Sequence, residues 1–269
     1  MLFYGVDSPL SGENGSYVPD ARFCIRCGAP YAYDYRTYGH LGAFYCPNCG
    51  YRRPQPHVSA RPAEPEGSES RIALNINGGE FEACLALPGA YNVYNAAAAA
   101  CALHGAGFSP QEIKSALETV SCGFGRMEKF NIGGGAQMIL VKNPVGFTQV
   151  LQYIAGMREP FVLVLCLNDK LADGTDISWI WDADFELLSA ASDKIAKIYL
   201  SGTRAEELLV RLKYAGVSCP EITIVRGYGE LTRRLSSEEL PIIVVPTYTA
   251  MMELRPYLAR EAGSKGFWE

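Results

Sequence analysis

Four of the nine cysteines have a spacing that could bind a metal ion. They form two Cys-x-x-Cys pairs, Cys24-Ile-Arg-Cys27 and Cys46-Pro-Asn-Cys49, with eighteen residues between the pairs. Two such pairs can aim four thiolates at one point, which is the tetrahedral sulfur set of a structural zinc site. A glycine follows each pair, where the turn of a metal knuckle favours a positive φ. Because four thiolates leave no open coordination position, we expect this zinc to be structural rather than catalytic.

Disulfides or a redox-active pair are the alternatives for these cysteines. The sequence has no secretory signal pattern and no apolar run of transmembrane length. The other five cysteines are scattered through apolar segments, at positions 84, 101, 122, 166 and 219. That usage is typical of a reducing cytoplasm, where Cys-x-x-Cys pairs bind metal. We therefore favour a four-cysteine zinc ribbon over residues 21–56 of a cytoplasmic protein.

A run of carboxylates is the second set of residues that could do chemistry. Asp173, Asp176 and Asp182 follow an unbroken apolar segment, and the loop Asp173-Gly174-Thr175-Asp176 is well placed to contact a substrate. The structural alternative for Asp182 is a helix N-cap. Asp184 would then only complement the positive end of that helix.

The elements that position these acids are strands alternating with helices. Apolar segments predict strands at 137–142, 161–167, 195–200, 222–225 and 241–245. Helical segments follow at 146–157, within 168–192, and at 203–215, 228–236 and from 247. This alternation indicates a parallel, doubly wound α/β sheet, in which ligands bind at the carboxyl ends of the strands. The polar residues expected there are at 142–143, 168–182, 201–202 and 246–247.

The first half of the chain has a different organisation. We expect a strand at 1–6, for which no earlier segment could supply a sheet neighbour, and a Pro-rich connector at 53–70. Alternating residues around Asn77-Gly78-Gly79 predict a β-hairpin over 71–87. An alanine-rich helix follows from Asn92, and Ser109-Pro110-Gln-Glu112 is a capping signal for another. We expect two parts, 1–122 and 123–269.

Bulk charge bears on the class of partner. The net charge is −5 and the pI about 5.4, which does not favour binding of nucleic acid. The ribbon has five arginines that could form a basic face, at positions 22, 26, 36, 52 and 53. Solvated loop charge is the interpretation we prefer for them.

Several segments together resemble the Mur ligase family. Ala90-Tyr91-Asn92-Val93-Tyr94-Asn95 is similar to the G-x-H-N-x-x-N segment of its central ATPase domain, with Tyr91 where many members have His. Phe124-Gly125-Arg126-Met127-Glu128 resembles the G-R-x-E element that begins the C-terminal domain. The resemblance implies that Arg126 reaches ATP phosphates and that Lys142 and Asn143 lie in the nucleotide-contacting loop, although the usual Asp of that loop is absent.

The resemblance is closer to the MurT family, the ligase-like subunits of lipid II isoglutaminyl synthase. It rests on the ribbon, on L-V-K-N-P-V-G-F at 140–147 and on L-N-D-K-L-A-D-G-T-D-I-S-W-I-W-D at 167–182. Further matching strings are S-G-T-R-A at 201–205, R-L-K-Y-A-G at 211–216 and P-T-Y-T-A-M at 246–251. These segments cover essentially the whole chain in order.

The resemblance implies an ATP- and Mg²⁺-dependent ligase acting at the inner face of the membrane. Such a subunit activates the α-carboxylate of D-glutamate in the stem peptide of lipid II as an acyl phosphate. Ammonia released from glutamine by the partner GatD then replaces the phosphate. The resemblance also implies one essential aspartate, which would orient or deprotonate the incoming ammonium; the catalytic candidates are Asp176, which we prefer, Asp173 and Asp182.

One family element is missing from the sequence. No G-x-x-G-K-[ST] phosphate-binding loop occurs in the 269 residues, so we expect an inactive fragment that resembles the C-terminal three fifths of the subunit. An in-frame loop of this type upstream of Met1 in the genomic DNA would test the expectation. The alternative is a non-catalytic module that binds a partner and holds a structural zinc ribbon.

Overall fold

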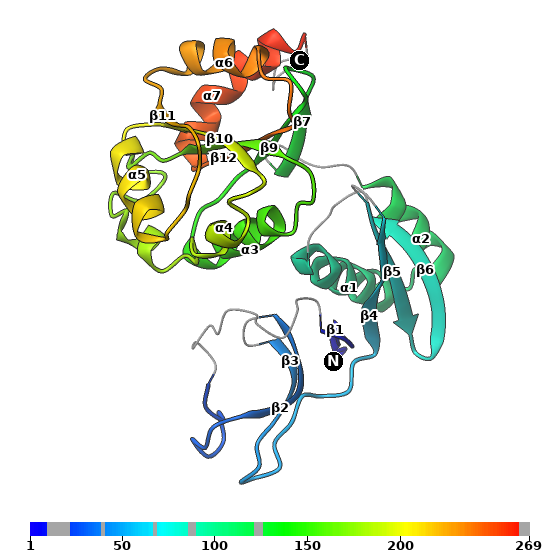
Figure 1. Ribbon diagram of the computed structural model, residues 1–269. Coiled ribbons are helices and arrows are strands. Elements are labelled where there is room, and N and C mark those ends of the chain that lie inside the picture. Colours follow the sequence, from blue (N-terminus) through cyan, green and yellow to red (C-terminus); the bar gives the residue numbers. More distant parts are fainter. Residues whose placement is uncertain (10–21, 39–40, 67–68, 86–89, 121–125, 264–269) are drawn as a thin grey trace. The chain divides into compact units, whose positions relative to one another are not determined.

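The computed structural model describes residues 1–9, 22–38, 41–66, 69–85, 90–120 and 126–263. The backbone divides into two compact units, Met1–Ser121 and Cys122–Glu269, each of which is considered by itself (Figure 1). Within the described ranges, no helix combines the length and apolar character needed to cross a membrane.

The second unit is built on a six-stranded sheet with the order β11-β10-β9-β12-β8-β7. Five strands are parallel, and β7 pairs antiparallel with β8 at one edge. The bounds are β7 Arg126–Phe130, β8 Ala136–Ile139, β9 Phe161–Cys166, β10 Ile195–Ser201, β11 Ile222–Ile224 and β12 Ile242–Pro246. The structure confirms the expected α/β class.

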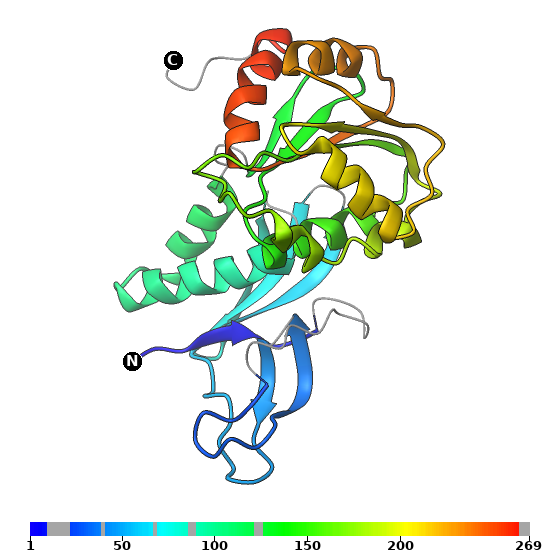
Figure 2. The same cartoon turned by 90° about the vertical axis from the view of Figure 1, so that its left-hand side faces the viewer.

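Helices cover both faces of this sheet, as Figure 2 shows for α5 on one side and α6 with α7 on the other. Strand β9 is buried at all six residues, which explains its unbroken apolar sequence. Each face of the sheet packs against its own group of helices. The first group is α3 Pro144–Ala155, α4 Leu187–Ala190 and α5 Ala205–Tyr214, and the second is α6 Tyr228–Ser236 and α7 Tyr248–Glu261.

Strand β7 was not predicted, and its geometry explains why. It is five residues long and its pairing with β8 shifts between Arg126 and Glu128. Met127, at that shift, has a φ of 60° and is buried, so the strand lacks a regular alternation. Glu128 accepts two hydrogen bonds from Arg255 of α7 at 2.7 and 3.0 Å. This ion pair fastens the edge strand to the rest of the unit.

The first unit contains a four-stranded sheet with the order β1-β4-β5-β6. Strands β4, β5 and β6 are antiparallel, whereas β1 runs parallel to β4. The bounds are β1 Tyr4–Val6, β4 Val58–Glu66, β5 Glu69–Ile76 and β6 Gly79–Leu85. The predicted hairpin at 71–87 is therefore confirmed, with Asn77 at a φ of 49° in its turn.

One expectation for this unit was wrong, the connector at 53–70. Residues 58–66 of the expected connector form β4, and β4 is the sheet neighbour that the sequence did not reveal for β1. Val58 and Ala60 are buried and pair with β1. Pro62 lies beyond the three residues of β4 that pair with β1, where the strand needs no backbone donor on that edge. The proline-rich composition concealed the strand.

Two helices pack on this sheet. Helix α1, Ala90–Gly105, buries Ala97 and Ala100 completely, and these small side chains let it approach the strands closely. Helix α2, Pro110–Thr119, begins with the predicted capping box. The amide N–H of Ser109 donates to the Glu112 carboxylate at 2.8 Å, and the N–H of Glu112 donates to the Ser109 hydroxyl at 3.4 Å.

The ribbon hairpin, β2 Ala32–Tyr38 and β3 Leu41–Tyr45, is tied to the end of β1. The Tyr35 hydroxyl and the Arg53 guanidinium both donate to the Val6 carbonyl, at 3.2 and 3.0 Å. Arg53 also pairs with Asp7 at 2.6 Å. Two side chains of the ribbon thus occupy a backbone acceptor at the edge of the sheet.

Candidate functional site

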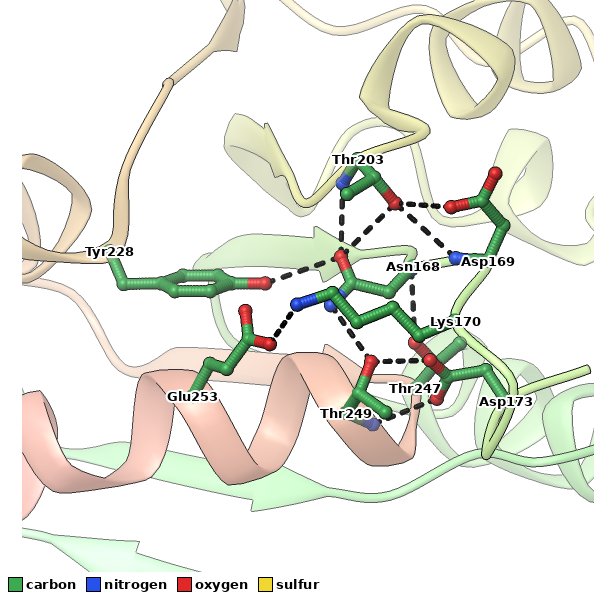
Figure 3. Close-up of polar contacts among 9 residues, drawn as sticks. All are labelled: Asn168, Asp169, Lys170, Asp173, Thr203, Tyr228, Thr247, Thr249 and Glu253. Atoms are coloured by element: carbon green, nitrogen blue, oxygen red, sulfur yellow. Dashed lines mark hydrogen bonds and ion pairs between the residues drawn. The ribbon is translucent and has the colours of Figure 1, made fainter. Parts of the chain in front are cut away.

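Polar side chains meet where β9, β10 and β12 end, at the carboxyl edge of the six-stranded sheet (Figure 3). Asn168 lies at the centre and is only 1% exposed. Its backbone N–H donates to Thr247 Oγ1 at 3.0 Å, and its side-chain amide donates to Thr249 Oγ1 at 2.9 Å. Its side-chain oxygen accepts the Thr203 N–H at 2.9 Å and the Tyr228 hydroxyl at 3.4 Å. Asn168 therefore joins three loops and is nearly saturated by protein partners.

Gly202 explains how the loop after β10 reaches this asparagine. Its φ is 93°, and a Cβ there would lie 2.3 Å from the Leu167 carbonyl oxygen and 2.8 Å from Asn168 Oδ1. Only glycine allows both the left-handed backbone and the close approach. The S-G-T string at 201–203 is thus required by the geometry around Asn168.

Asp173 has a structural partner at the start of α7. Its carboxylate accepts the Thr249 N–H at 2.8 Å and also the Thr249 hydroxyl. The N-cap residue of that helix, Thr247, makes no side-chain cap bond of its own, because its hydroxyl accepts the Asn168 N–H. Asp173 therefore caps α7 from a distant loop. The ion pair between Lys170 and Glu253 adds a second tie between the same loop and helix.

Asp176 is exposed and differs from Asp173 in its bonding. The Ser178 N–H donates to its carboxylate at 2.8 Å, at the start of a 3-10 helix, Ser178–Trp181. Hydrogen bonds from the backbone and side chain of Ser178 hold the pKa of Asp176 below its ordinary value. The group is therefore a carboxylate at neutral pH, on an exposed residue.

Asp182 lies at the opposite end of that 3-10 helix. It is the C-cap residue, and its N–H donates to the Trp179 carbonyl at 3.1 Å. The N-cap alternative suggested by the sequence is thus wrong, because the next helix begins only at Leu187 and its N-cap residue is Glu186. The Asp182 side chain is exposed.

Asp169 is a further carboxylate at the same edge. The Thr203 hydroxyl donates to it at 2.9 Å and Arg204 pairs with it at 3.1 Å. The hydrogen bond from Thr203, followed by the contact with Arg204, holds the pKa of Asp169 below its ordinary value. Asp169 thus presents negative charge just after the end of β9.

The expected nucleotide-contacting residues differ in their surroundings. The Lys142 ammonium lies 4.6 Å from the ring centroid of Tyr248, the first residue of α7. Asn143 is the N-cap of α3, and its side-chain oxygen accepts the Gly146 N–H at 2.7 Å. The Arg126 backbone lies in β7, and its side chain is outside the described part of the structure.

A buried arginine holds the acidic segment in place. Arg211 of α5 is 3% exposed and donates to the Ile180 and Ala183 carbonyls at 3.2 and 2.9 Å. It also pairs with Glu186 at 2.7 Å. Its guanidinium lies 5.3 Å from the ring of Trp181. This single side chain fixes the backbone on both sides of Asp182.

The four cysteines of the ribbon converge as predicted. Their sulfurs all lie within 4.8 Å of one another, and the Cys24–Cys49 and Cys27–Cys46 sulfurs are 3.6 and 3.4 Å apart. A tetrahedron with metal–sulfur bonds of ~2.3 Å separates its sulfurs by ~3.8 Å, whereas a disulfide bond is ~2.05 Å long. The donor set therefore fits a tetrahedral metal and not disulfides.

Backbone geometry supports the same interpretation of the ribbon. The two knuckles are nearly identical: Gly28 donates to the Cys24 carbonyl and Gly50 to the Cys46 carbonyl, at 2.8 and 3.0 Å. Their φ values are 74° and 73°, so the expected positive φ is confirmed at both glycines.

Several residues of the site were not singled out from the sequence. They are Thr203, Arg204, Arg211, Tyr228, Thr249 and Glu253. Thr203 and Thr249 lie 35 and 81 residues from Asn168. A signal was present in the S-G-T-R-A and P-T-Y-T-A-M strings, which place hydroxyl side chains directly after two predicted strands.

Comparisons with known proteins agree with this geometry. The sequence profile of the family "MurT ligase C-terminal" matches residues 140–251, which include most of the Asn168 network. The MurT subunit of lipid II isoglutaminyl synthase (glutamine-hydrolyzing) from Staphylococcus aureus (strain COL) is 36% identical over 265 residues, which are 97% of this chain and 58% of that protein.

Solved structures show the same fold. A pseudomurein peptide ligase type C from Methanothermus fervidus aligns over 96% of this chain and 52% of its own, with a TM-score of 0.68 and 21% identity. MurF ligase from Thermotoga maritima, determined in complex with ADP, aligns over 78% and 47%, with a TM-score of 0.53 and 11% identity. The chain spans somewhat more than half the length of the curated relatives that it matches. Residues 140–251 thus match the MurT ligase C-terminal family, the chain is similar to MurT subunits over nearly all of its length, and its fold is an α/β fold of the Mur ligase type.

Proposed function

We propose that this chain is the C-terminal portion of an ATP-dependent carbon–nitrogen ligase subunit that amidates the D-glutamate α-carboxylate of lipid II. The observation that carries the proposal is the 36% identity to a MurT subunit over nearly the whole chain. Bound Mg-ATP would supply the phosphoryl group that activates the carboxylate. Ammonia would come from a glutaminase partner, GatD.

Within this scheme the carboxylates have different tasks. Asp173 is engaged by the start of α7, so it is a positioning residue that fixes the loop. Asp176 is exposed and ionised, so it is the residue we assign to binding and orienting ammonium. Asp182 remains a second candidate, because it is exposed on a segment held by Arg211.

Two basic side chains would hold the nucleotide, one at the start of the second unit and one at the carboxyl edge of its sheet. Arg126 and Lys142 are the groups we assign to the phosphates. Asn143 already caps α3, so its contact with the ribose would use the amide nitrogen. The 269 residues contain no G-x-x-G-K-[ST] string, and we therefore propose that they do not turn over ATP by themselves.

Zinc is the metal we assign to Cys24, Cys27, Cys46 and Cys49. Four thiolates at these separations match its tetrahedral preference. Since protein sulfurs fill the whole coordination sphere, the ion holds the two knuckles together and takes no part in ligation.

The glutaminase is expected to bind the second unit near its exposed aromatics. Trp181 is 49% exposed and Tyr214 is 73% exposed, and their rings are in contact with centroids 5.5 Å apart. Large aromatic side chains left in water next to an acid-lined segment are typical of an interface. Trp179, in contrast, packs against Phe147 in the core.

Reconstitution tests the proposal. The chain is co-expressed with GatD and with the part of the Staphylococcus aureus relative that it does not cover, and amidated lipid II is measured by mass spectrometry. The proposal expects product only when both ATP and glutamine are present. Stable binding of GatD without ATP hydrolysis or amidation would instead support a non-catalytic binding module, which the missing phosphate-binding string favours.

A further inference from the structure

The ribbon carries a charge opposite to that of the remaining chain. Residues 22–56 hold five arginines and one aspartate, a formal charge of +4, so the chain total of −5 leaves −9 elsewhere. Zinc with four thiolates contributes −2, and the loaded ribbon would still carry +2. The positive charge is therefore concentrated in the small metal-bound module.

Most of this charge is open to a partner. Arg53 pairs with Asp7, but within the residues that the structure describes Arg22, Arg26 and Arg52 form no ion pair. All three are exposed. Arg22 lies over the Phe23 ring at 5.5 Å and Arg26 over the Tyr51 ring at 4.4 Å, so the cations are associated with aromatic surface rather than with carboxylates.

Comparison of the two knuckles shows that the metal does not require these residues. The knuckles share their backbone hydrogen bonds, yet the first has Ile25 and Arg26 between its cysteines where the second has Pro47 and Asn48. Ile25 is 80% exposed, and Phe23, directly before Cys24, is 54% exposed. Two apolar side chains are thus held in water by a rigid turn and flanked on both sides by arginine.

We infer that this first knuckle, residues 22–26, binds the surface of an anionic phospholipid bilayer. Phe23 and Ile25 would enter the interfacial layer, while Arg22 and Arg26 would bind headgroup phosphates. The metal-fixed turn would present the four side chains with little loss of conformational freedom on binding. The inference names a further partner for the proposed function, whose substrate is lipid-linked, and that function is the reason for choosing a membrane over a nucleic acid.

Vesicle co-sedimentation tests the inference with the whole chain. The probes are vesicles of phosphatidylcholine alone and of phosphatidylcholine with phosphatidylglycerol. The variants are Ile25→Ser, Phe23→Ser with Ile25→Ser, and Arg22→Gln with Arg26→Gln. The matched control is Phe108→Ser with Arg233→Gln, at sites 47% and 75% exposed outside the ribbon. Zinc content of one ion per chain is required of every variant compared.

The inference expects binding that needs phosphatidylglycerol, weakens with added salt and is unchanged in the control. Each double variant should bind at least about tenfold more weakly, the change that corresponds to loss of one or two buried side-chain contacts. Equal binding by the ribbon variants, or tighter retention on duplex RNA or DNA than on vesicles, would overturn it. Amidation of detergent-solubilised lipid II by the reconstituted complex should survive in these variants, so failure here is distinct from failure of the proposed ligase activity.

Discussion

Replacing Asp173 by alanine should destabilise the second unit, because this carboxylate caps α7 from another loop. The change removes an acceptor for the Thr249 N–H at 2.8 Å and for the Thr249 hydroxyl. It leaves an orphan donor in the first turn of a helix whose own N-cap residue makes no side-chain cap bond. Loss of a helix cap costs ~1 kcal/mol, and hydrogen bonds to a charged group are each worth ~1.5–3 kcal/mol. We expect the free energy of unfolding to fall by about 2 kcal/mol.

Urea unfolding, monitored by tryptophan fluorescence, measures this loss of stability in the second structural unit. All three tryptophans, at positions 179, 181 and 268, lie in the second half of the sequence. Asp173→Asn retains an acceptor and should lose about half as much stability. Asp193→Ala is the matched control, since that exposed carboxylate pairs with its sequence neighbour Lys194 and its loss should change stability by less than about 0.5 kcal/mol.

A double variant separates the cap from a general effect at Asp173. Thr249→Val removes the hydroxyl partner but keeps the N–H. If the two side chains act together, Asp173→Ala combined with Thr249→Val should cost less than the sum of the single changes. Additive costs, or a loss below about 0.5 kcal/mol for Asp173→Ala, would refute the positioning role and return Asp173 to the catalytic candidates.

Three more outcomes are expected. Cys46→Ser should lower the zinc content, measured by elemental mass spectrometry, from one ion per chain to less than about 0.1 ion per chain. Cys219→Ser should leave the zinc content unchanged. Arg211→Met should cost about 2–4 kcal/mol in urea unfolding, because two buried carbonyls lose their donor; a loss below about 1 kcal/mol would contradict the anchoring role. Asp169 has a folded pKa below its unfolded value of about 3.9, so its contribution to stability is present above that pH and is lost as the pH falls through the lower folded pKa. Asp169→Asn should therefore flatten the decline in stability below about pH 4, and an unchanged decline would argue against the contact with Thr203.

The sequence predicted the carboxyl edge of the sheet but not the contacts made there. Alternation of apolar strands with helices is sufficient to place 142, 168–182, 201–202 and 246–247 at one edge. It contains no information on which hydroxyl meets which amide across 35 or 81 residues. The roles of Asp173 as a remote cap and Asn168 as a hub therefore emerged only from the packed structure.

Predictions from local sequence patterns failed for two strands, β4 and β7. Prolines at 62 and 65 argued for a connector, yet Val58–Glu66 forms a strand, and among the described residues β1 pairs only with its first three residues. Strand β7 was missed for a different reason. Met127 has a φ of 60°, which interrupts the regular alternation of side chains along this strand. The cysteine knuckles were predictable in detail, since four ligands of one ion impose their own local geometry.

Amidation of lipid II is the most direct test of the central claim. A complex reconstituted from this chain, the part of the Staphylococcus aureus relative that the chain does not cover and the glutaminase is assayed with ATP and glutamine, and Asp176→Asn is compared with the unaltered protein at equal zinc content. The account predicts product that depends on both ATP and glutamine and a fall of at least about 100-fold in the variant. Undiminished amidation by Asp176→Asn would contradict the assigned role of this carboxylate. A folded, zinc-loaded complex that makes no amidated product would contradict the ligase function itself.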